Sequence, residues 1–365
     1  MKLRTNGVAL ALLACGAVSL PLRASAWDRG RPRVFATLPP GASGPEGLEV
    51  DAKGRVYVTT FGFTASGSAS GLGQLYVYDD DGRLLRQVSI AGSSPHLLGL
   101  RFHPTTGALL VIDFGSAQVL DVDPKTGGSS VFMTLPSPLP HPTLGAGLND
   151  ITFDHAGNVY VSDSFQGIVW KTTQHGGVGS VWVDTPLLRT TGVPPFGANG
   201  LRFNQHETAM FVANTGDDTV IKIPTVPGQE ESSGLAAGSP AVFTNSINGA
   251  DGLLIDKDDN LWVVANQADE IVVVDPTGKA ISKLGDFGGL NDGSPIQMLF
   301  PASLRFFKND LLVTNLSLDL RLFNPAFETV DSEWCAQVSR YTVVRIRARI
   351  KGFGETFEEH GEDEH

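Results

Sequence analysis

The chain contains a repeat of 50 to 52 residues, and this repeat limits its possible folds more than any other feature. Six segments open with the same short strand pattern, L-x-F/I/V-D/N, followed by a turn rich in Gly, Asp and Asn and then by an alternating strand such as Val159-Tyr160-Val161. A third strand follows in most units, and a fourth closes most of them. The opening positions are 46, 98, 149, 199, 251 and 302. Period-two alternation broken by turns is typical of antiparallel strands.

Four strands in each of six repeats predict an all-β fold, a six-bladed β-propeller. An open row of such sheets would leave unpaired edges, whereas a ring protects them. Residues 34–39 (VFATLP) closely resemble residues 131–136 (VFMTLP), which form the fourth strand of the second repeat. We therefore expect the N-terminal segment to close the last blade as its outer strand, next to a third strand within residues 338–350. No long amphipathic helix is expected.

The two ends of the chain predict export and a solvated tail. Lys2 and Arg4 precede an apolar stretch at residues 8–22, and residues 24–26 (ASA) form an A-x-A cleavage site. We interpret residues 1–26 as a signal peptide, so that the mature chain begins near Trp27 and is secreted or periplasmic. The apolar stretch is too short and interrupted for a membrane span. We expect residues 27–350 to form the propeller and residues 351–365 to be an acidic, disordered tail.

Charge and cysteine content exclude several alternatives. The net charge is −12, whereas nucleic acid and anionic lipid both need a basic surface on their partner. Of the two cysteines, Cys15 lies in the predicted signal peptide. The mature chain then has no disulfide, and Cys335 is expected to be a packed, unreactive thiol.

The six opening positions enter the innermost strands, so their side chains should face the axis of the ring. They are Glu46, Leu98, Asn149, Asn199, Asp251 and Ala302. Two carboxylates and two amides offer oxygen ligands of the kind that hard cations prefer, and two carboxylates this close would repel each other without a cation. Calcium tolerates such an irregular set better than magnesium, and zinc would prefer His or Cys.

The sequence therefore predicts a metal site on Glu46, Asn149, Asn199 and Asp251. We expect Ca²⁺ there, with another divalent cation as the alternative. A blander interpretation is that Asn199 and Asp251 are turn residues, because each precedes a glycine. Glu46 does not fit that interpretation, since glutamate is not a typical turn residue.

Four short motifs resemble those of a known family of calcium-dependent six-bladed propeller hydrolases. They are Pro45-Glu46-Gly47, Leu148-Asn149-Asp150, Ala198-Asn199-Gly200 and Ala250-Asp251-Gly252. The family is the gluconolactonase and regucalcin-like (SMP-30-type) group, with diisopropylfluorophosphatase and paraoxonase as relatives, and the resemblance covers about residues 33–350. It implies that these four residues hold a catalytic calcium. It also implies hydrolysis of a small molecule: a lactone, an ester or an organophosphate.

In that mechanism calcium acts as a Lewis acid on the carbonyl or phosphoryl oxygen, and Asp251 serves as general base or nucleophile. His96 is a further acid–base candidate; its alternative is a loop histidine that makes hydrogen bonds. Residues 135–144, with His141, could wall the pocket or be an ordinary connection. A set of Asp and Asn side chains at the ends of the second strands is expected to be structural: Asp113, Asp163, Asn214, Asn266 and Asn315.

Other functions fit the same fold. NHL-type and strictosidine synthase-like propellers share similar repeats, and many of them bind partners without catalysis. A non-catalytic binding propeller with a structural metal is therefore the alternative to a hydrolase, and an isomerase or lyase on the same scaffold is a third interpretation. The hydrolase is favoured, and an open metal beside a pocket would distinguish it from the binding propeller.

Overall fold

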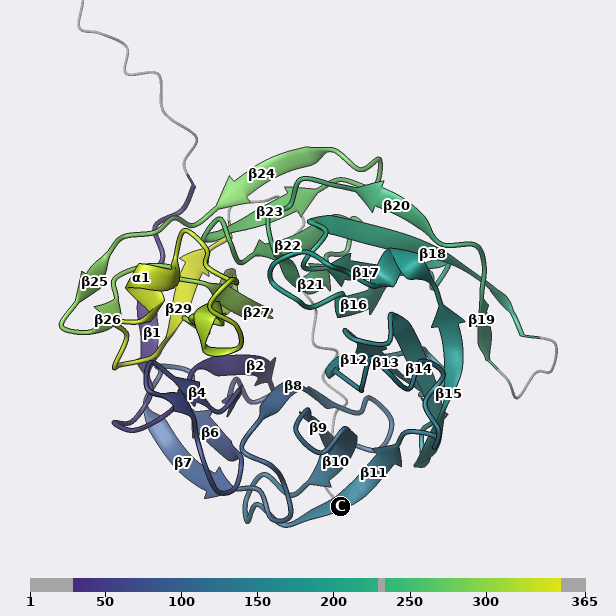
Figure 1. The fold of residues 1–365 in the computed structure, drawn as a ribbon, viewed down its shortest axis with the longest axis horizontal. Coiled ribbons are helices and arrows are strands. Elements are labelled where there is room, and N and C mark those ends of the chain that lie inside the picture. The colour runs from purple at the N-terminus through teal and green to yellow at the C-terminus, as the bar shows by residue number, and fades with distance from the viewer. Residues whose placement is uncertain (1–28, 229–233, 349–365) are drawn as a thin grey trace, which may run out of the picture.

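The computed structural model describes residues 29–228 and 234–348. Within them the strands form a ring of sheets around a central axis, with the chain running once around it (Figure 1). The predicted signal peptide (residues 1–26) and acidic tail (residues 351–365) lie outside the described residues. No helix in the described ranges combines the length and the apolar character that a membrane crossing requires.

Apart from two short ribbons, the described strands divide into units of four or five strands, each running from the axis outwards. The first contains β2 (Pro45–Val50), β3 (Val56–Thr60), β6 (Gln74–Tyr78) and β7 (Leu84–Ser89). The second contains β8 (Leu97–Phe102), β9 (Leu109–Asp113), β10 (Gln118–Val122) and β11 (Ser129–Thr134). The third contains β12 (Leu148–Phe153), β13 (Val159–Asp163), β14 (Ile168–Thr173) and β15 (Gly176–Asp184). A short parallel pairing of β11 with β15 joins the second and third units into one eight-stranded sheet.

The remaining units complete the ring. The fourth contains β16 (Ala198–Phe203), β17 (Ala209–Asn214) and β18 (Thr219–Pro227), with β19 (Leu235–Ala237) and β20 (Ala241–Thr244) both paired to β18. The fifth contains β21 (Ala250–Ile255), β22 (Leu261–Ala265), β23 (Glu270–Val274) and β24 (Ala280–Leu284). The last contains β27 (Pro301–Phe307), β28 (Asp310–Asn315), β29 (Thr342–Arg347) and β1 (Arg33–Thr37).

The N-terminal strand closes the ring, as predicted. β1 pairs antiparallel with β29, from Arg33 opposite Arg345 to Thr37 opposite Thr342. Each innermost strand contacts the next one, and β27 returns to β2. The all-β fold and the closing role of the N-terminal strand are therefore confirmed, and β29 lies inside the range expected for the third strand of the last unit.

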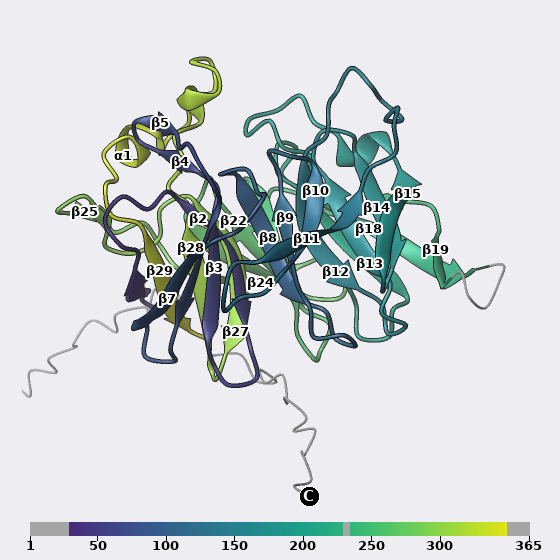
Figure 2. The same cartoon turned by 90° about the horizontal axis from the view of Figure 1, so that it is seen from below.

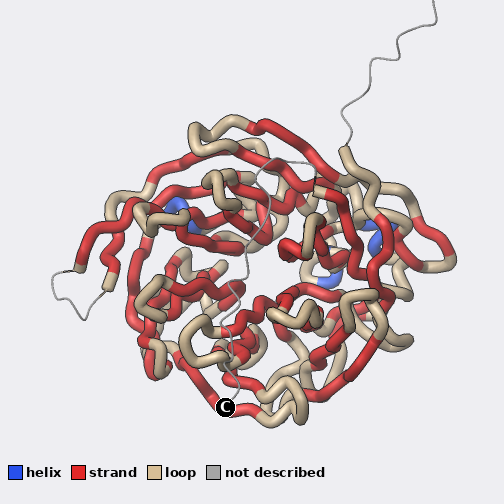
Figure 3. Tube along the Cα trace, turned by 180° about the vertical axis from the view of Figure 1, so that it is seen from behind, coloured by secondary structure: helices blue, strands red, loops and turns tan. Residues whose placement is uncertain are grey.

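The smaller elements sit mainly on one face of the ring. The two-stranded ribbon β4 (Phe63–Thr64) and β5 (Gly67–Ser68) and the short helix α1 (Ser332–Cys335) project from that face (Figure 2). Two 3₁₀ turns cover Pro186–Leu188 and Leu320–Leu322, and a second ribbon pairs β25 (Leu290–Asn291) with β26 (Ser294–Pro295). Seen from behind, the described chain is strand and loop with only short helical turns (Figure 3).

The apolar core lies between neighbouring sheets. Each sheet is covered on both faces, so second strands such as β3 and β22 are buried along their whole length, whereas the outer strand β7 is mostly exposed. Aromatic pairs cross from one unit to the next: Tyr160 meets Phe203 edge-on at 5.0 Å, and Trp262 meets Phe306 at 5.7 Å. Cys335 is buried, and burial raises the pKa of its thiol, as expected of an unreactive cysteine.

Candidate functional site

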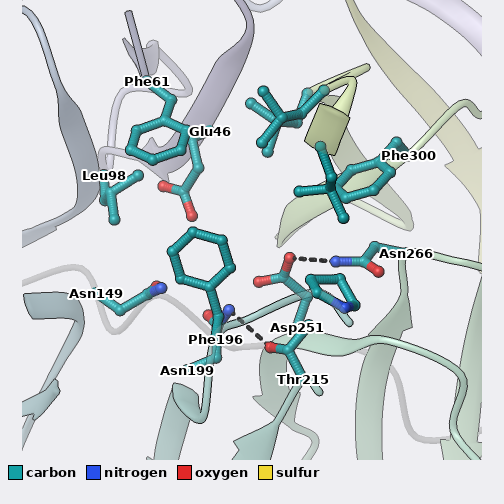
Figure 4. Close-up of a pocket in the computed structure, with 14 residues that line it drawn as sticks. Glu46, Phe61, Leu98, Asn149, Phe196, Asn199, Thr215, Asp251, Asn266 and Phe300 are labelled. Carbon is teal, nitrogen blue, oxygen red and sulfur yellow. Dashed lines mark hydrogen bonds between the residues drawn. The ribbon is translucent and has the colours of Figure 1, made fainter. Parts of the chain in front are cut away.

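The predicted metal ligands converge on one pocket at the axis. Each is the second residue of an innermost strand: Glu46 of β2, Asn149 of β12, Asn199 of β16 and Asp251 of β21. All four line the same pocket (Figure 4). Because Asn199 and Asp251 lie inside strands, the interpretation of these two as turn residues is wrong.

A backbone irregularity recurs at this point in every innermost strand. The register of β2 against β3 shifts between Pro45 and Leu48, and the other five innermost strands shift at the corresponding place. A bulge of this kind redirects the side chains that it carries. The repeated bulge thus explains how regularly paired strands present their second residues to the axis.

A glycine follows three of the four candidate ligands, Glu46, Asn199 and Asp251, and allows adjacent strands to meet there. A Cβ on Gly200 would lie 2.6 Å from both Asp251 O and Leu253 N, and a Cβ on Gly47 would lie 2.3 Å from Leu98 O. No side chain fits at these distances from the neighbouring backbone. The Asn-Gly and Asp-Gly pairs are therefore explained by close packing of β16 against β21 and of β21 against β27.

Both candidate amide ligands have their nitrogen atoms held by hydroxyl groups. Asn149 Nδ2 donates to Ser164 Oγ at 3.2 Å, and Asn199 Nδ2 donates to Thr215 Oγ1 at 3.0 Å. These hydroxyls in turn donate to the next innermost strand, at Ala198 O and Ala250 O. With the nitrogens occupied, the amide oxygens are the atoms left to act as ligands, and Asn149 Oδ1 is buried without a hydrogen-bond partner.

The two candidate carboxylate ligands are almost fully buried. Glu46 and Asp251 are each 5% exposed, and Glu46 Oε2 has no hydrogen-bond partner. Burial, followed by repulsion from Asp251 and Asp150, raises the pKa of Glu46 well above its usual value. Burial also raises the pKa of Asp251 to about 7. Two buried carboxylates cannot both carry charge at low cost unless a cation accompanies them, so this pair fits a metal.

The donor set combines carboxylates with amides. In the described ranges, no cluster of three or more His, Cys, Asp or Glu side chains could hold a metal ion. A site on Glu46, Asn149, Asn199 and Asp251 therefore depends on amide oxygens for half of its side-chain ligands, which suits a hard cation such as calcium and not zinc.

One residue expected to be structural supports the site instead. Asp113, Asp163, Asn214 and Asn315 do end their second strands, and they hold backbone groups of nearby loops, as when Asp163 Oδ1 accepts from Gly147 N. Asn266 was grouped with them wrongly, because β22 ends one residue earlier, at Ala265. Its Nδ2 donates to Asp251 Oδ2 at 2.9 Å. This hydrogen bond orients the carboxylate and favours its charged form.

Apart from Thr215 and Asn266, the rest of the described pocket wall is apolar, and the repeat did not predict it. Phe61 follows β3, Phe300 precedes β27, and Phe196 lies on the connection before β16. The segment between β28 and β29 adds Leu316, Leu318 and Leu320. In the view of Figure 4 the Phe196 ring lies among the four candidate ligands. The one sequence signal was composition, since Phe numbers 20 against 5 Tyr and 5 Trp.

His96 lies behind the wall and not among the lining residues. Its Nδ1 is 2.7 Å from Phe61 O, its Nε2 is 3.2 Å from Ser68 Oγ, and its ring stacks on Phe63. This placement favours the alternative of a hydrogen-bonded loop histidine, while its role as acid or base stays a prediction. None of residues 135–144 is among the described lining residues. His141 in this loop pairs with Asp184 at 2.8 Å.

A layer of buried charge lies next to the candidate ligands. Most of it is formed by residues that lie three positions after the second residue of four innermost strands: Glu49, Arg101, Arg202 and Arg305. Arg202 pairs with Asp150 at 2.8 Å, and Glu49 accepts from Arg305 at 3.3 Å. The charge of Arg305 opposes the rise in the pKa of Glu46. The sequence patterns did not predict this layer.

Comparison with known proteins places the chain in a family. The family model described as SMP-30/Gluconolactonase/LRE-like region matches residues 93–285, and a strictosidine synthase-like N-terminal model matches residues 34–62. The first match spans more than half of the chain, so the chain belongs to the SMP-30/gluconolactonase/LRE-like family.

Individual relatives are distant. Lactonase drp35 of Staphylococcus saprophyticus is 28% identical over 159 residues, which is 42% of this chain and 46% of the relative. The chain thus spans about half the length of the curated relatives it matches. Among solved structures, regucalcin from Agrobacterium tumefaciens, titled a calcium-binding protein, aligns with a TM-score of 0.57 at 16% identity over 87% of this chain and 96% of its own. A gluconolactonase from Xanthomonas campestris aligns with a TM-score of 0.54 at 14% identity, over 78% and 91%. These structures are similar in fold.

Proposed function

We propose that the chain is an exported, calcium-dependent hydrolase that acts on a lactone, an ester or a related small molecule. The observation that carries this proposal is the convergence of four oxygen-bearing side chains on one buried pocket, with Glu46 Oε2 and Asn149 Oδ1 lacking partners. Buried polar atoms without partners are costly, and a bound cation would satisfy both. Another divalent cation is the alternative to calcium.

Family membership supports the reaction class. The matching relatives include proteins named lactonase and gluconolactonase, and one structural neighbour is titled a calcium-binding protein. Export is supported by the N-terminal sequence alone, through Lys2, Arg4 and the ASA site at residues 24–26.

The geometry gives roles to individual side chains. A bound calcium would supply a Lewis acid for the substrate's carbonyl or phosphoryl oxygen and offset the negative charge that develops there. Asn266 holds one oxygen of Asp251, and Figure 4 shows the other oxygen directed into the pocket. Asp251 would use that oxygen as general base on water or as nucleophile. The Phe196 ring at the site would limit the access of bulk water.

A binding propeller with a structural metal is the second candidate. The observation that favours it is the position of the Phe196 ring among the four candidate ligands, because a ring so close to the ion could keep substrate away and leave the ion to serve stability alone (Figure 4). Turnover of any substrate that depends on both calcium and Asp251 would exclude this candidate.

Calcium binding tests the site. We expect about one calcium per chain by elemental analysis, and a melting temperature that falls when a chelator removes it, because an ion bound to the folded state stabilises it by about 2.7 kcal/mol at a concentration of 100 times its Kd. The variant Glu46→Gln should bind calcium more weakly, whereas Asp81→Asn, which changes an exposed carboxylate, should behave as the wild type. The proposal would be contradicted if elemental analysis found no metal and the melting temperature did not change when the chelator was added.

Activity tests the reaction. The purified mature chain should hydrolyse at least one member of a panel of lactones, aryl esters and phosphotriesters, and only with calcium present. Asp251→Asn keeps the shape of the side chain and should lower kcat at least about 100-fold while the circular dichroism spectrum stays unchanged. Retained turnover in that variant would rule out the role given to Asp251.

A further inference from the structure

The pocket has a polar part and an apolar part. Outside the four candidate ligands, the polar side chains among its described lining residues are Thr215 and Asn266, and both belong to the fourth and fifth units. The opposite part, at the last, first and second units, is formed by Phe300, Phe61 and Leu98, each 2% exposed. Apart from the candidate ligands, a substrate held at the axis would therefore face hydrogen-bonding side chains of the described lining on one side only.

The side chains of Thr215 and Asn266 already form hydrogen bonds with other groups of the protein. Thr215 Oγ1 donates to Ala250 O at 2.8 Å and accepts from Asn199 Nδ2 at 3.0 Å. Asn266 donates to Asp251, and its Oδ1 accepts from Gln267 Nε2 at 3.1 Å. Within the described lining, a substrate carrying several hydroxyl groups would thus find few partners for them beyond the candidate ligands.

A cluster of phenylalanine rings continues the apolar part towards the mouth of the pocket. Phe196 stacks on Phe165 at 5.9 Å and meets Phe61 and Phe323 at 6.4 and 6.2 Å. Phe61 in turn contacts Phe114 edge-on at 5.3 Å. These rings come from separate connections around the ring of sheets, so the apolar surface is assembled at the pocket and is not part of one blade's core. Phe323 is 38% exposed, which places the edge of the cluster at the solvent.

We propose that the substrate carries an apolar substituent, an alkyl chain or an aryl ring, and is not a polyhydroxylated sugar lactone. This inference rests on the proposed hydrolysis for its reacting group. The carbonyl end lies at the four oxygen ligands, and the substituent lies against Phe61, Phe196 and Phe300. Burying each methylene there is worth about fourfold in affinity, whereas each sugar hydroxyl buried without a partner costs about fivefold or more.

A lactone series tests the substrate class directly. The full chain with calcium is assayed against γ-lactones whose alkyl substituent grows from methyl to octyl, and against glucono-lactone. We expect kcat/KM to rise about fourfold per methylene until the pocket is filled, and the butyl lactone to exceed glucono-lactone by at least about tenfold. A preference for glucono-lactone, or a rate independent of chain length, would overturn the inference.

Variants of Phe196 test the role of this ring at the site. Phe196→Ser should flatten the dependence of kcat/KM on chain length, and Phe196→Leu should keep most of it because it keeps the apolar surface. Phe243→Ser is the matched control, since this half-buried ring packs on Phe211 and Lys222 in the fourth unit, away from the pocket. Equal slopes in Phe196→Ser and the wild type would contradict the role given to Phe196.

A binding measurement separates this inference from the proposed function. The same alkyl series is prepared as γ-lactams, which resist hydrolysis, and titrated into the full chain by calorimetry. Tighter binding with each methylene but no turnover of any lactone would end the proposed hydrolysis and leave the apolar specificity standing. Lactam affinity that does not change with chain length would overturn the apolar specificity even if lactones are hydrolysed.

Discussion

A single hydrogen bond distinguishes Asn266 from the residues at the corresponding position in neighbouring units. Ser164 and Thr215 hold the corresponding place in neighbouring units, and their hydroxyls donate to backbone carbonyls of the next strand. Asn266 donates to the carboxylate of Asp251 instead. A partner of this kind fixes the orientation of a metal ligand and is often almost as important as the ligand itself.

We predict that Asn266→Ala weakens calcium binding by about 10- to 100-fold without unfolding the chain. Asp251 would lose the donor that orients it, while the ligand itself remains. Calcium titration calorimetry measures the change, and Gln267→Ala is the control, because the side chain of Gln267 donates to Asn266 and leaves the bond from Asn266 to Asp251 in place. Equal calcium affinity in Asn266→Ala and the wild type would show that Asn266 is merely structural.

The alignment of the repeats explains both why the positions of the candidate ligands could be predicted from the sequence and why Asn266 was assigned to the wrong group. Side chains alternate between the faces of a strand, so a position is correctly assigned only if the alignment of repeats is correct to the residue. The apolar pair that opens each repeat fixed the alignment for Glu46, Asn149, Asn199 and Asp251. The end of β22 offered no such marker, and a shift of one residue grouped Asn266 with side chains that face elsewhere.

At the scale of the element, innermost strands such as β16 combine a bulge with a glycine. The bulge aims the second residue at the axis, and the glycine after it lets the neighbouring strand approach. The ligand spacing therefore depends on backbone contacts between β16 and β21 as much as on the side chains themselves.

We predict that Gly200→Ala destabilises the fold by about 1–3 kcal/mol and also weakens calcium binding. The new methyl group would lie 2.6 Å from Asp251 O, so β16 and β21 must separate, and Asn199 moves away from Asp251. Urea denaturation with and without calcium measures both effects. Gly128→Ala should be tolerated, because its Cβ would meet only the Thr126 hydroxyl, at 3.3 Å. Unchanged stability in Gly200→Ala would contradict the close approach.

Strands were more predictable than connections. The fourth strand expected at residues 131–136 overlaps β11, because repetition and alternation both mark it. The pocket wall comes from connections, such as those that carry Phe196 and Leu318. These segments differ from one unit to the next, so no repeat pattern reveals which of them fold over the axis.

At the scale of the whole molecule, two buried acidic side chains influence each other's charge: Asp269 of the fifth unit and Asp331 of the segment between β28 and β29. Asp269 and Asp331 are 4% and 5% exposed, and Asp269 Oδ1 accepts from Phe300 N at 2.7 Å. Burial raises the pKa of Asp269 to about 8, with repulsion from Asp331 adding to it, and burial raises the pKa of Asp331 to about 6. The folded chain therefore holds protons that the unfolded chain releases at about pH 4.

We predict that this pair makes stability fall as pH rises. A raised pKa in the folded state means that the contribution is complete below about pH 4 and is lost as pH increases through about 6 to 8. Asp331→Asn removes one member, so its free energy of unfolding should decline less between pH 5 and pH 8.5 than that of the wild type, by an amount on the order of 1–3 kcal/mol. Urea denaturation at both pH values measures the difference. Asp81→Asn is the control, and parallel pH profiles for wild type and Asp331→Asn would contradict the prediction.

The pairing of β1 with β29 also sets an order of events during synthesis. Of the described strands, β1 leaves the ribosome first and its partner β29 leaves last. Until Thr342–Arg347 emerges, the early strand has no place in a sheet, and the first and last units cannot be joined. Closing so long a loop carries an entropic cost and slows folding. A nascent chain halted before β29 would thus hold complete early blades but an open ring. A chain halted earlier, before Phe300, would also lack this residue and the leucines that follow β28, and therefore part of the pocket wall.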